Sequence, residues 1–178
     1  MDEGPHRPAG TMIVIADTSP LNYIIQLGLI EELHTIYGDV IVPTAVREEM
    51  QHPRSPDAVR SWSATLPEWA ELRRPRELDR TLPPNLGSGE REAISLAIEL
   101  HASMLLIDDL PGRMAAKERH IQFTGTLAIL FQAALMNNLD YNLKIDELRL
   151  LGFRATDAVL ETMKERFKSA RGPNPNRK

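Results

Sequence analysis

The sequence predicts an α/β protein: a three-layer sandwich in which a short, mostly parallel sheet is flanked by helices and the C-terminal third is rich in helices. Three observations predict this fold class. Several short runs are apolar on both faces, which is typical of strands in a parallel sheet that helices cover. The segments between these runs have the apolar spacing of helices. The length of 178 residues, 42% of them hydrophobic and 26% charged, favours one domain over two.

Four of the apolar runs have the length and the β-branched content of strands. They are residues 13–16, 40–42, 104–107 and 121–123. The first ends at Asp17, the second at Pro43 and the third at Asp108. We expect each run to be a buried strand of the same sheet.

Helical spacing accounts for most of the remaining chain. Apolar residues between positions 21 and 33 predict two short helices that are broken at Gly28. A longer helix carries Ala93, Ile94, Ala97 and Leu100 along its buried face. Further helices are expected over residues 126–136, 143–151 and 157–167. Residues 66–86 contain four prolines and little apolar pattern, so they are expected to form a long connection.

The two ends of the chain differ in composition from the middle. Residues 1–11 are rich in glycine and proline and read as a flexible N-terminal extension. Residues 12–170 form the expected folded domain, and residues 171–178 read as a disordered tail. No stretch has the roughly 20 apolar residues of a membrane span, and the first ten residues lack the apolar run of a signal peptide. We therefore expect a cytoplasmic protein without a membrane partner.

Composition also limits the chemistry. The chain has no cysteine, so a metal ion would have to be held by oxygen or imidazole ligands. The net charge of −4 argues against a protein that coats nucleic acid through its overall field. A nucleic-acid ligand would need a local basic strip, and two occur in sequence, although solvated surface charges are the commoner explanation for such strips. They are Arg73, Arg74, Arg76 and Arg80, and Lys164, Arg166, Lys168 and Arg171.

Two aspartates directly follow predicted strands. Ligand sites of open parallel sheets lie beyond the carboxyl ends of the strands, where Asp17 and Asp108 are expected. A single aspartate in such a position is more often the N-cap of a helix than a ligand. Two in equivalent positions, on strands that could be neighbours, favour a shared site.

Two glutamates are expected to join them. Glu90 opens the helix that carries Ala93 and Ile94 and lies at the edge of its buried face, although it would also favour the helix dipole. Glu49 is spaced three residues from Val46 and is expected to point inward, whereas Glu48 points away. Carboxylates gathered in one place repel one another unless a cation neutralises them. Oxygen ligands without cysteine favour Mg²⁺ or Mn²⁺, ions that serve the hydrolysis of phosphodiesters.

Asp109 follows Asp108, and only one of the two can continue the strand toward the crevice. We assign Asp108 to the crevice because it ends the buried run directly. Asp109 precedes Leu110 and Pro111, so it is expected to be the N-cap of a helix with proline in its first turn.

Five segments together resemble a known family. They are IVIADTSPLNYIIQLG, VIVPTAVREEM, LGSGEREAISLA, LLIDDLPGRMAA and FTGTLAIL, and they span essentially residues 12–165. In order and spacing they resemble the PIN-domain nucleases, in particular the toxin halves of VapBC-type toxin–antitoxin pairs.

This resemblance implies an endoribonuclease that depends on Mg²⁺ or Mn²⁺. It implies metal ligands at Asp17, Glu49, Glu90 and Asp108, and Thr18 or Ser19 as an accessory hydroxyl. Asp109 stays among the candidate catalytic acids, because shifting the alignment by one residue moves the last acid from Asp108 to Asp109. The resemblance also implies RNA as the substrate and a small antitoxin as a partner, and it leaves a homodimer open.

The sequence departs from the family pattern at two places. Glu90 stands where many relatives have aspartate, and Leu106 and Ile107 stand where a threonine or serine often precedes the last acid. A second hypothesis is therefore kept beside the first: a catalytically weak PIN-like module that works by binding RNA or protein.

Overall fold

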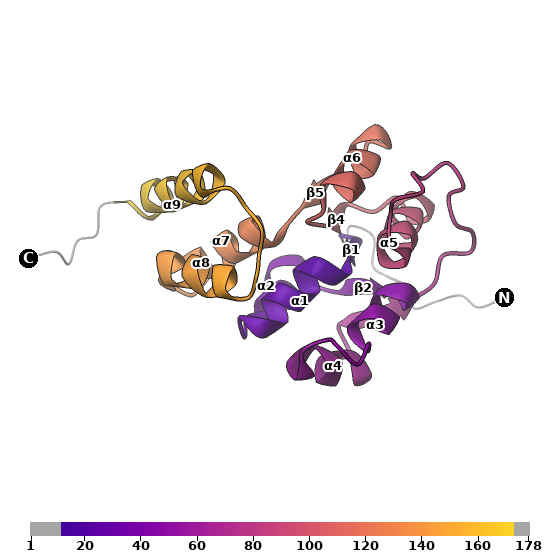
Figure 1. Ribbon diagram of the computed structural model, residues 1–178, viewed down its shortest axis with the longest axis horizontal. Helices are drawn as coiled ribbons and strands as arrows, with labels where there is room; N and C mark the ends of the chain where they lie inside the picture. Colours follow the sequence, from indigo (N-terminus) through magenta and orange to yellow (C-terminus); the bar gives the residue numbers. More distant parts are fainter. Residues whose placement is uncertain (1–11, 173–178) are drawn as a thin grey trace, which may run out of the picture.

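The computed structural model describes residues 12–172, within which a five-stranded parallel sheet is flanked by nine helices (Figure 1). The strands are β1 (Val14–Ala16), β2 (Val40–Pro43), β3 (Ala70–Arg73), β4 (Met104–Leu106) and β5 (Phe123–Thr124). The helices are α1 (Thr18–Gln26), α2 (Ile30–Tyr37), α3 (Thr44–Met50), α4 (Asp57–Ala64), α5 (Ser88–Glu99), α6 (Leu110–Glu118), α7 (Thr126–Met136), α8 (Tyr141–Leu150) and α9 (Asp157–Arg171).

The strand order is β3-β2-β1-β4-β5, and every pair is parallel. Ile15 in β1 lies opposite Ile41 in β2 and Leu105 in β4. The chain moves outward from β1 to β2 and β3, then returns to the other side of β1 to form β4 and β5. The order therefore reverses between β1 and β4, and in a sheet of this kind a ligand site forms beyond the carboxyl ends of those two strands.

Alternating strand residues face two separate cores, as the period of two requires. Val14 and Ala16 of β1 pack with helices α1, α2, α7, α8 and α9. Ile15 points to the opposite face and packs with α5 and α6. Both faces of the central strands are thus buried, which explains their uninterrupted apolar sequence. The predicted three-layer α/β fold is confirmed.

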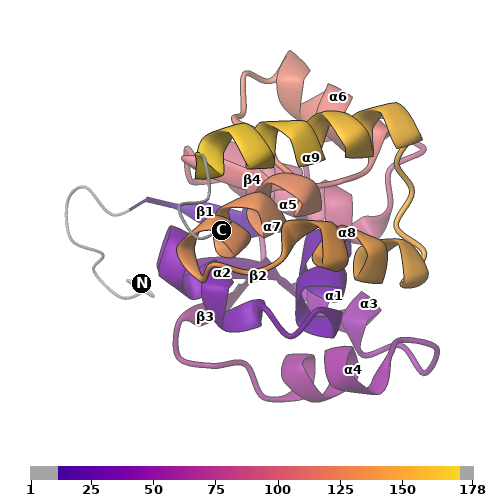
Figure 2. The same ribbon diagram turned by 90° about the vertical axis from the view of Figure 1, so that its left-hand side faces the viewer.

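The C-terminal third is helical, and an aromatic cluster holds it together. The ring of Tyr141 in α8 stacks on Phe167 in α9 at 4.6 Å, and Phe131 in α7 meets both rings edge to face. In Figure 2 these three helices lie in front of the sheet. This arrangement agrees with the predicted helix-rich C-terminal third.

Two elements are absent from the prediction. The connection expected over residues 66–86 contains strand β3, and helix α4 lies in a segment for which no helix was expected. Strand β3 lies at the sheet edge and has only β2 as a neighbour. Its residues Glu71 and Arg73 form an ion pair at 3.5 Å, so it lacks the doubly apolar pattern of the inner strands.

The C-terminal end of the last helix can be compared with the expected domain bounds. Helix α9 extends to Arg171, one residue into the expected tail. The expected N-terminal extension, residues 1–11, and the rest of the tail, residues 173–178, lie outside the described residues. Within residues 12–172, no helix is both long enough and apolar enough to cross a membrane.

Candidate functional site

The switch point between β1 and β4 is lined by acids. The backbone N–H of Asp17, directly after β1, donates to the carbonyl of Leu106 at the end of β4 at 2.9 Å. This bond ties the two strand ends together, and Asp108 and Asp109 follow β4 within three residues. Two further acids enter the same region from helices α3 and α5.

Asp17 is almost completely buried, with 2% of its surface exposed. Its Oδ1 atom has no hydrogen-bond partner among the described residues. The pKa of Asp17 is raised to about 8, chiefly by burial and also by the carboxylates of Glu90, Glu49 and Asp109, against a lowering effect of the Thr18 backbone. A buried carboxylate that lacks a donor on one oxygen is costly to ionise unless a cation lies beside it.

Glu49 projects from α3 and is held by donors from two other helices. Its Oε1 accepts from the backbone N–H of Gly89 at 2.8 Å and from the hydroxyl of Ser88 at 3.1 Å, at the start of α5. Its Oε2 accepts from the hydroxyl of Thr18 at the start of α1. Glu48, by contrast, is exposed. The carboxylate of Glu49 therefore has a fixed direction, set by three elements.

Glu90 in the first turn of α5 uses only one of its carboxylate oxygens. Oε2 accepts from the backbone N–H of Gly87 at 2.9 Å, whereas Oε1 is buried without a partner among the described residues. Burial raises the pKa of Glu90, the Gly87 bond lowers it, and Asp109 and Glu49 raise it. Gly112 faces the unpartnered oxygen closely: a Cβ atom there would lie 2.8 Å from Oε1.

Asp108 is hydrogen-bonded to the start of α7. Its carboxylate accepts from both the backbone N–H and the hydroxyl of Thr126, at 2.8 and 2.6 Å, and lies 3.7 Å from the guanidinium of Arg113. Burial raises the pKa of Asp108, while Thr126 and Arg113 lower it and Asp109 raises it. Both oxygens of this acid are thus already engaged by the protein.

Asp109 is exposed and receives no hydrogen bond from the N-terminus of α6. Its charge acts on Asp17 and Glu90, the two acids with unpartnered oxygens. Asp109 thus occupies the expected N-cap position of α6, with proline in the first turn, but its side chain makes no capping hydrogen bond. Asp108, by contrast, has both carboxylate oxygens engaged by Thr126.

The four acids expected to hold a metal do not meet as ligands of one ion in this arrangement. They are Asp17, Glu49, Glu90 and Asp108. Among residues 12–172, no three acidic or histidine side chains come together closely enough to hold a metal ion. Two of the carboxylates are turned toward backbone donors at the start of α5, Glu49 toward Gly89 and Glu90 toward Gly87.

The comparisons with known proteins agree with this fold. A family model, DUF3368, described as a PIN domain, matches residues 13–169. The chain belongs to this PIN-domain family. Among solved structures, the chain is similar to a PilT N-terminus domain protein from the hyperthermophilic archaeon Sulfolobus solfataricus P2, with 18% identity and a TM-score of 0.50. That alignment covers 68% of this chain and 93% of the other. A search of curated proteins found no match.

The two hydroxyls expected to assist this PIN domain differ in their contacts. Thr18 donates to Glu49 and so links α1 to α3. Ser19 is half-buried on the same helix. Thr18 thus helps to hold the carboxylate of Glu49 in place.

One buried acid of the PIN domain lies outside the acid cluster, by which we mean Asp17, Glu49, Glu90, Asp108 and Asp109. Glu92 in α5 accepts from the backbone N–H of Ala45, at the start of α3, at 2.8 Å. Since Glu49 of α3 accepts from Gly89 at the start of α5, each of the two helices caps the beginning of the other. Sequence analysis missed Glu92 and Thr126. The apolar neighbours of Glu92 in α5, Ala93 and Ile94, were the signal that it is inward.

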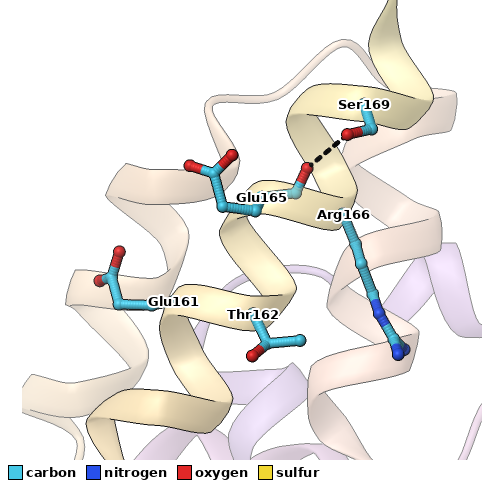
Figure 3. A pocket seen from close by; sticks show the side chains of 5 residues that line it. All are labelled: Glu161, Thr162, Glu165, Arg166 and Ser169. Carbon is cyan, nitrogen blue, oxygen red and sulfur yellow. Dashed lines mark hydrogen bonds between the residues drawn. The ribbon is translucent and has the colours of Figure 1, made fainter.

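A separate open hollow lies on the outer face of α9, lined by Glu161, Thr162, Glu165, Arg166 and Ser169 (Figure 3). All five residues come from one helix, and the Ser169 hydroxyl donates to the Glu165 carbonyl at 3.0 Å. None of the cluster acids lines it. The candidate site of this PIN domain is therefore the crevice at the strand ends.

Proposed function

We propose that the chain is a divalent-metal-dependent endoribonuclease that hydrolyses RNA phosphodiesters. One observation carries the proposal: Asp17 and Glu90 each present a buried carboxylate oxygen without a donor at the switch point of the sheet. Two such oxygens in one acidic crevice destabilise the fold unless a cation binds there. Membership of a PIN-domain family supports a nuclease-type fold for this arrangement.

The residues present suit a Mg²⁺ or Mn²⁺ ion in their chemistry. All four candidates, Asp17, Glu49, Glu90 and Asp109, offer carboxylate oxygens, which are the ligands that these hard ions prefer. Asp109 replaces Asp108 in this set because the Asp109 carboxylate is exposed, whereas Asp108 already lies 3.7 Å from the guanidinium of Arg113 and accepts two hydrogen bonds from Thr126. When bound, the ion would supply a nucleophilic water at neutral pH and stabilise the departing oxygen.

The residues of the chain itself supply position and shape. Ser88, Gly89 and Thr18 hold Glu49 in one direction, so this acid needs little ordering when a ligand arrives. Asp108 accepts two hydrogen bonds from Thr126 and so holds the start of α7 beside the end of β4. Gly112 leaves room beside Glu90 that a Cβ atom would fill.

A second candidate function is favoured by one observation. No three acids of the described residues lie close enough together to hold an ion as they stand. A PIN-like module that binds RNA or protein without cleaving it would have no need of such convergence. The two functions differ in a single measurable property, the metal-dependent cleavage of bound RNA.

We further propose the role of a toxin that a small antitoxin inhibits. The support is the resemblance of the sequence segments, together with a crevice rich in carboxylates, which suits a lysine or arginine from a disordered inhibitor tail. Co-expression with the product of the adjacent gene should yield a complex. Sedimentation of the chain alone then measures whether it also forms a homodimer.

The decisive experiment is cleavage of single-stranded RNA by the purified protein, titrated with Mg²⁺ or Mn²⁺. Activity should require the metal and stop with chelator, and Asp17→Asn should lose it while retaining the fold. Glu92→Gln serves as the control, because Glu92 is a buried acid outside the cluster. RNA binding without metal-dependent cleavage would favour the second candidate.

A further inference from the structure

A strand of RNA that approaches the acid cluster meets like charge. Asp17, Glu90 and Asp109 would repel its phosphates, and neutralisation by one bound ion would leave the flanking phosphates uncompensated. A nuclease at this position therefore needs donors or cations beside the cluster that are not already engaged by other acids.

The arginine strip at residues 73–80 does not meet this need. Each of its arginines lies within 3.5–3.7 Å of a glutamate carboxylate. The pairs are Arg73 with Glu71, Arg74 with Glu92, Arg76 with Glu99, and Arg80 with Glu77. Arg113 is closer to the site, but its Nε donates to the carbonyl of Ile107 and its guanidinium lies beside Asp108.

Arg154, in the connection between α8 and α9, is different. It is exposed and forms no ion pair or hydrogen bond with the residues that the structure describes. Its neighbour Phe153 packs edge to face on Tyr23 of α1, with ring centroids 5.1 Å apart. This contact anchors the connection alongside α1, where Figure 1 shows it passing.

Tyr23 links the segment between α8 and α9 to the acid cluster. It lies six residues after Asp17 along α1, or about 9 Å of helix rise, and one turn after Ser19 on the same face. Burial raises the pKa of the Tyr23 phenol, Asp108 and Asp109 raise it as well, and Arg154 lowers it. Because its pKa is raised, the hydroxyl remains protonated at neutral pH and can act as a hydrogen-bond donor.

Resting on the proposed ribonuclease function, we propose that Tyr23 and Arg154 form a subsite for an RNA phosphate that flanks the cleaved bond. The guanidinium of Arg154 neutralises this phosphate, and the hydroxyl of Tyr23 donates a hydrogen bond to it. The two side chains come from elements that the contact between Phe153 and Tyr23 holds together. RNA then lies across α1 and the connection between α8 and α9.

The test measures binding of a short single-stranded RNA at several salt concentrations, in the non-cleaving Asp17→Asn background. Arg154→Gln should weaken binding several-fold and reduce the slope of log affinity against log salt by about 0.7, the value for one lost phosphate contact. Arg154→Lys should restore the slope. Tyr23→Phe, which keeps the ring on Phe153, should weaken binding without changing the slope. In the cleaving parent, Arg154→Gln and Tyr23→Phe should each raise KM more than they lower kcat.

Arg166→Gln is the matched control, because Arg166 is an exposed arginine on α9 in the hollow of Figure 3. An equal loss of binding and slope with Arg166→Gln would assign the effect to overall charge and overturn the subsite. Unchanged KM and slope in Arg154→Gln, with normal cleavage by the parent, would overturn the subsite alone. A parent chain that neither binds nor cleaves the RNA would overturn the proposed function, and the subsite with it.

Discussion

Both carboxylate oxygens of Asp108 accept hydrogen bonds from one residue, Thr126. Oδ1 accepts from the backbone N–H at 2.8 Å and Oδ2 from the hydroxyl at 2.6 Å. These bonds join the end of β4 to the start of α7. The neighbouring acid, Asp109, is exposed and acts electrostatically on Asp17 and Glu90. Two consecutive aspartates therefore have separate roles, one in the fold and one in the proposed site.

The first prediction follows from this separation. Asp109→Asn should abolish RNA cleavage and leave the melting temperature nearly unchanged, because its side chain makes no hydrogen bond that holds the fold. Asp108→Asn should lower the free energy of unfolding by about 1–3 kcal/mol, because Thr126 loses an ionised acceptor. Thermal melts and cleavage assays on both variants measure the difference. Full cleavage by Asp109→Asn would return the assignment to Asp108.

The second prediction concerns pH and the carboxyl group of Asp17. Its pKa is raised from 3.8 to about 8 in the folded chain, so the unfolded state releases the proton first as pH rises. This group's contribution to stability is fully present below about pH 4, falls between pH 4 and pH 8, and is lost above that range. The slope is at most about 1.4 kcal/mol per pH unit.

Unfolding by denaturant in chelator, at pH values from 5 to 9 and with Asp17→Asn beside the parent, measures this contribution. The parent should lose more stability than Asp17→Asn as pH rises, and Mn²⁺ should raise the stability of the parent most at the alkaline end, because it binds the ionised form. Parallel pH profiles of the two proteins would show that Asp17 does not titrate in this range.

The third prediction uses two glycines near Glu90. A Cβ atom on Gly112 would lie 2.4 Å from Cδ1 of Ile107 and 2.8 Å from Oε1 of Glu90. Gly112→Ala should therefore displace Glu90 and reduce cleavage strongly. Gly87→Ala is the control, since its nearest atoms would be an ordinary 3.7 and 3.9 Å away. If Gly112→Ala cleaves as well as Gly87→Ala, the space beside Glu90 has no part in the reaction.

The inner sheet was predictable from sequence because its strands are buried on both faces. Val14 and Ile15 face opposite cores, so their run has no polar interruption. Strand β3 was not predictable in the same way, because an edge strand has one neighbour and carries Glu71 and Arg73.

The candidate site was predictable to the level of which strand ends and helices contribute acids. The engagement of Asp108 was not predictable, because it depends on Thr126, a residue 18 positions along the chain whose hydroxyl and N–H donate to that carboxylate. Long-range contacts of this kind leave no local pattern in the sequence. The contact between the rings of Tyr23 and Phe153, which are far apart in the chain, likewise leaves no local pattern in the sequence.

The last prediction compares two acids of α5 that lie two residues apart. Glu90 has a buried oxygen without a donor, whereas Glu92 accepts from the backbone N–H of Ala45 at 2.8 Å and lies 3.6 Å from Arg74. Glu90→Gln should abolish or greatly reduce cleavage while leaving the metal-free chain as stable as the parent or more so, because it removes a buried charge next to Asp109 and Glu49. Glu92→Gln should retain cleavage and lower stability by about 1–2 kcal/mol, because the start of α3 loses its carboxylate acceptor. Cleavage rates and denaturant melts are measured on both variants. Glu90→Gln should lose cleavage but not stability, and Glu92→Gln should lose stability but not cleavage. Loss of cleavage in Glu92→Gln at unchanged stability would mean that Glu92 belongs to the reacting site.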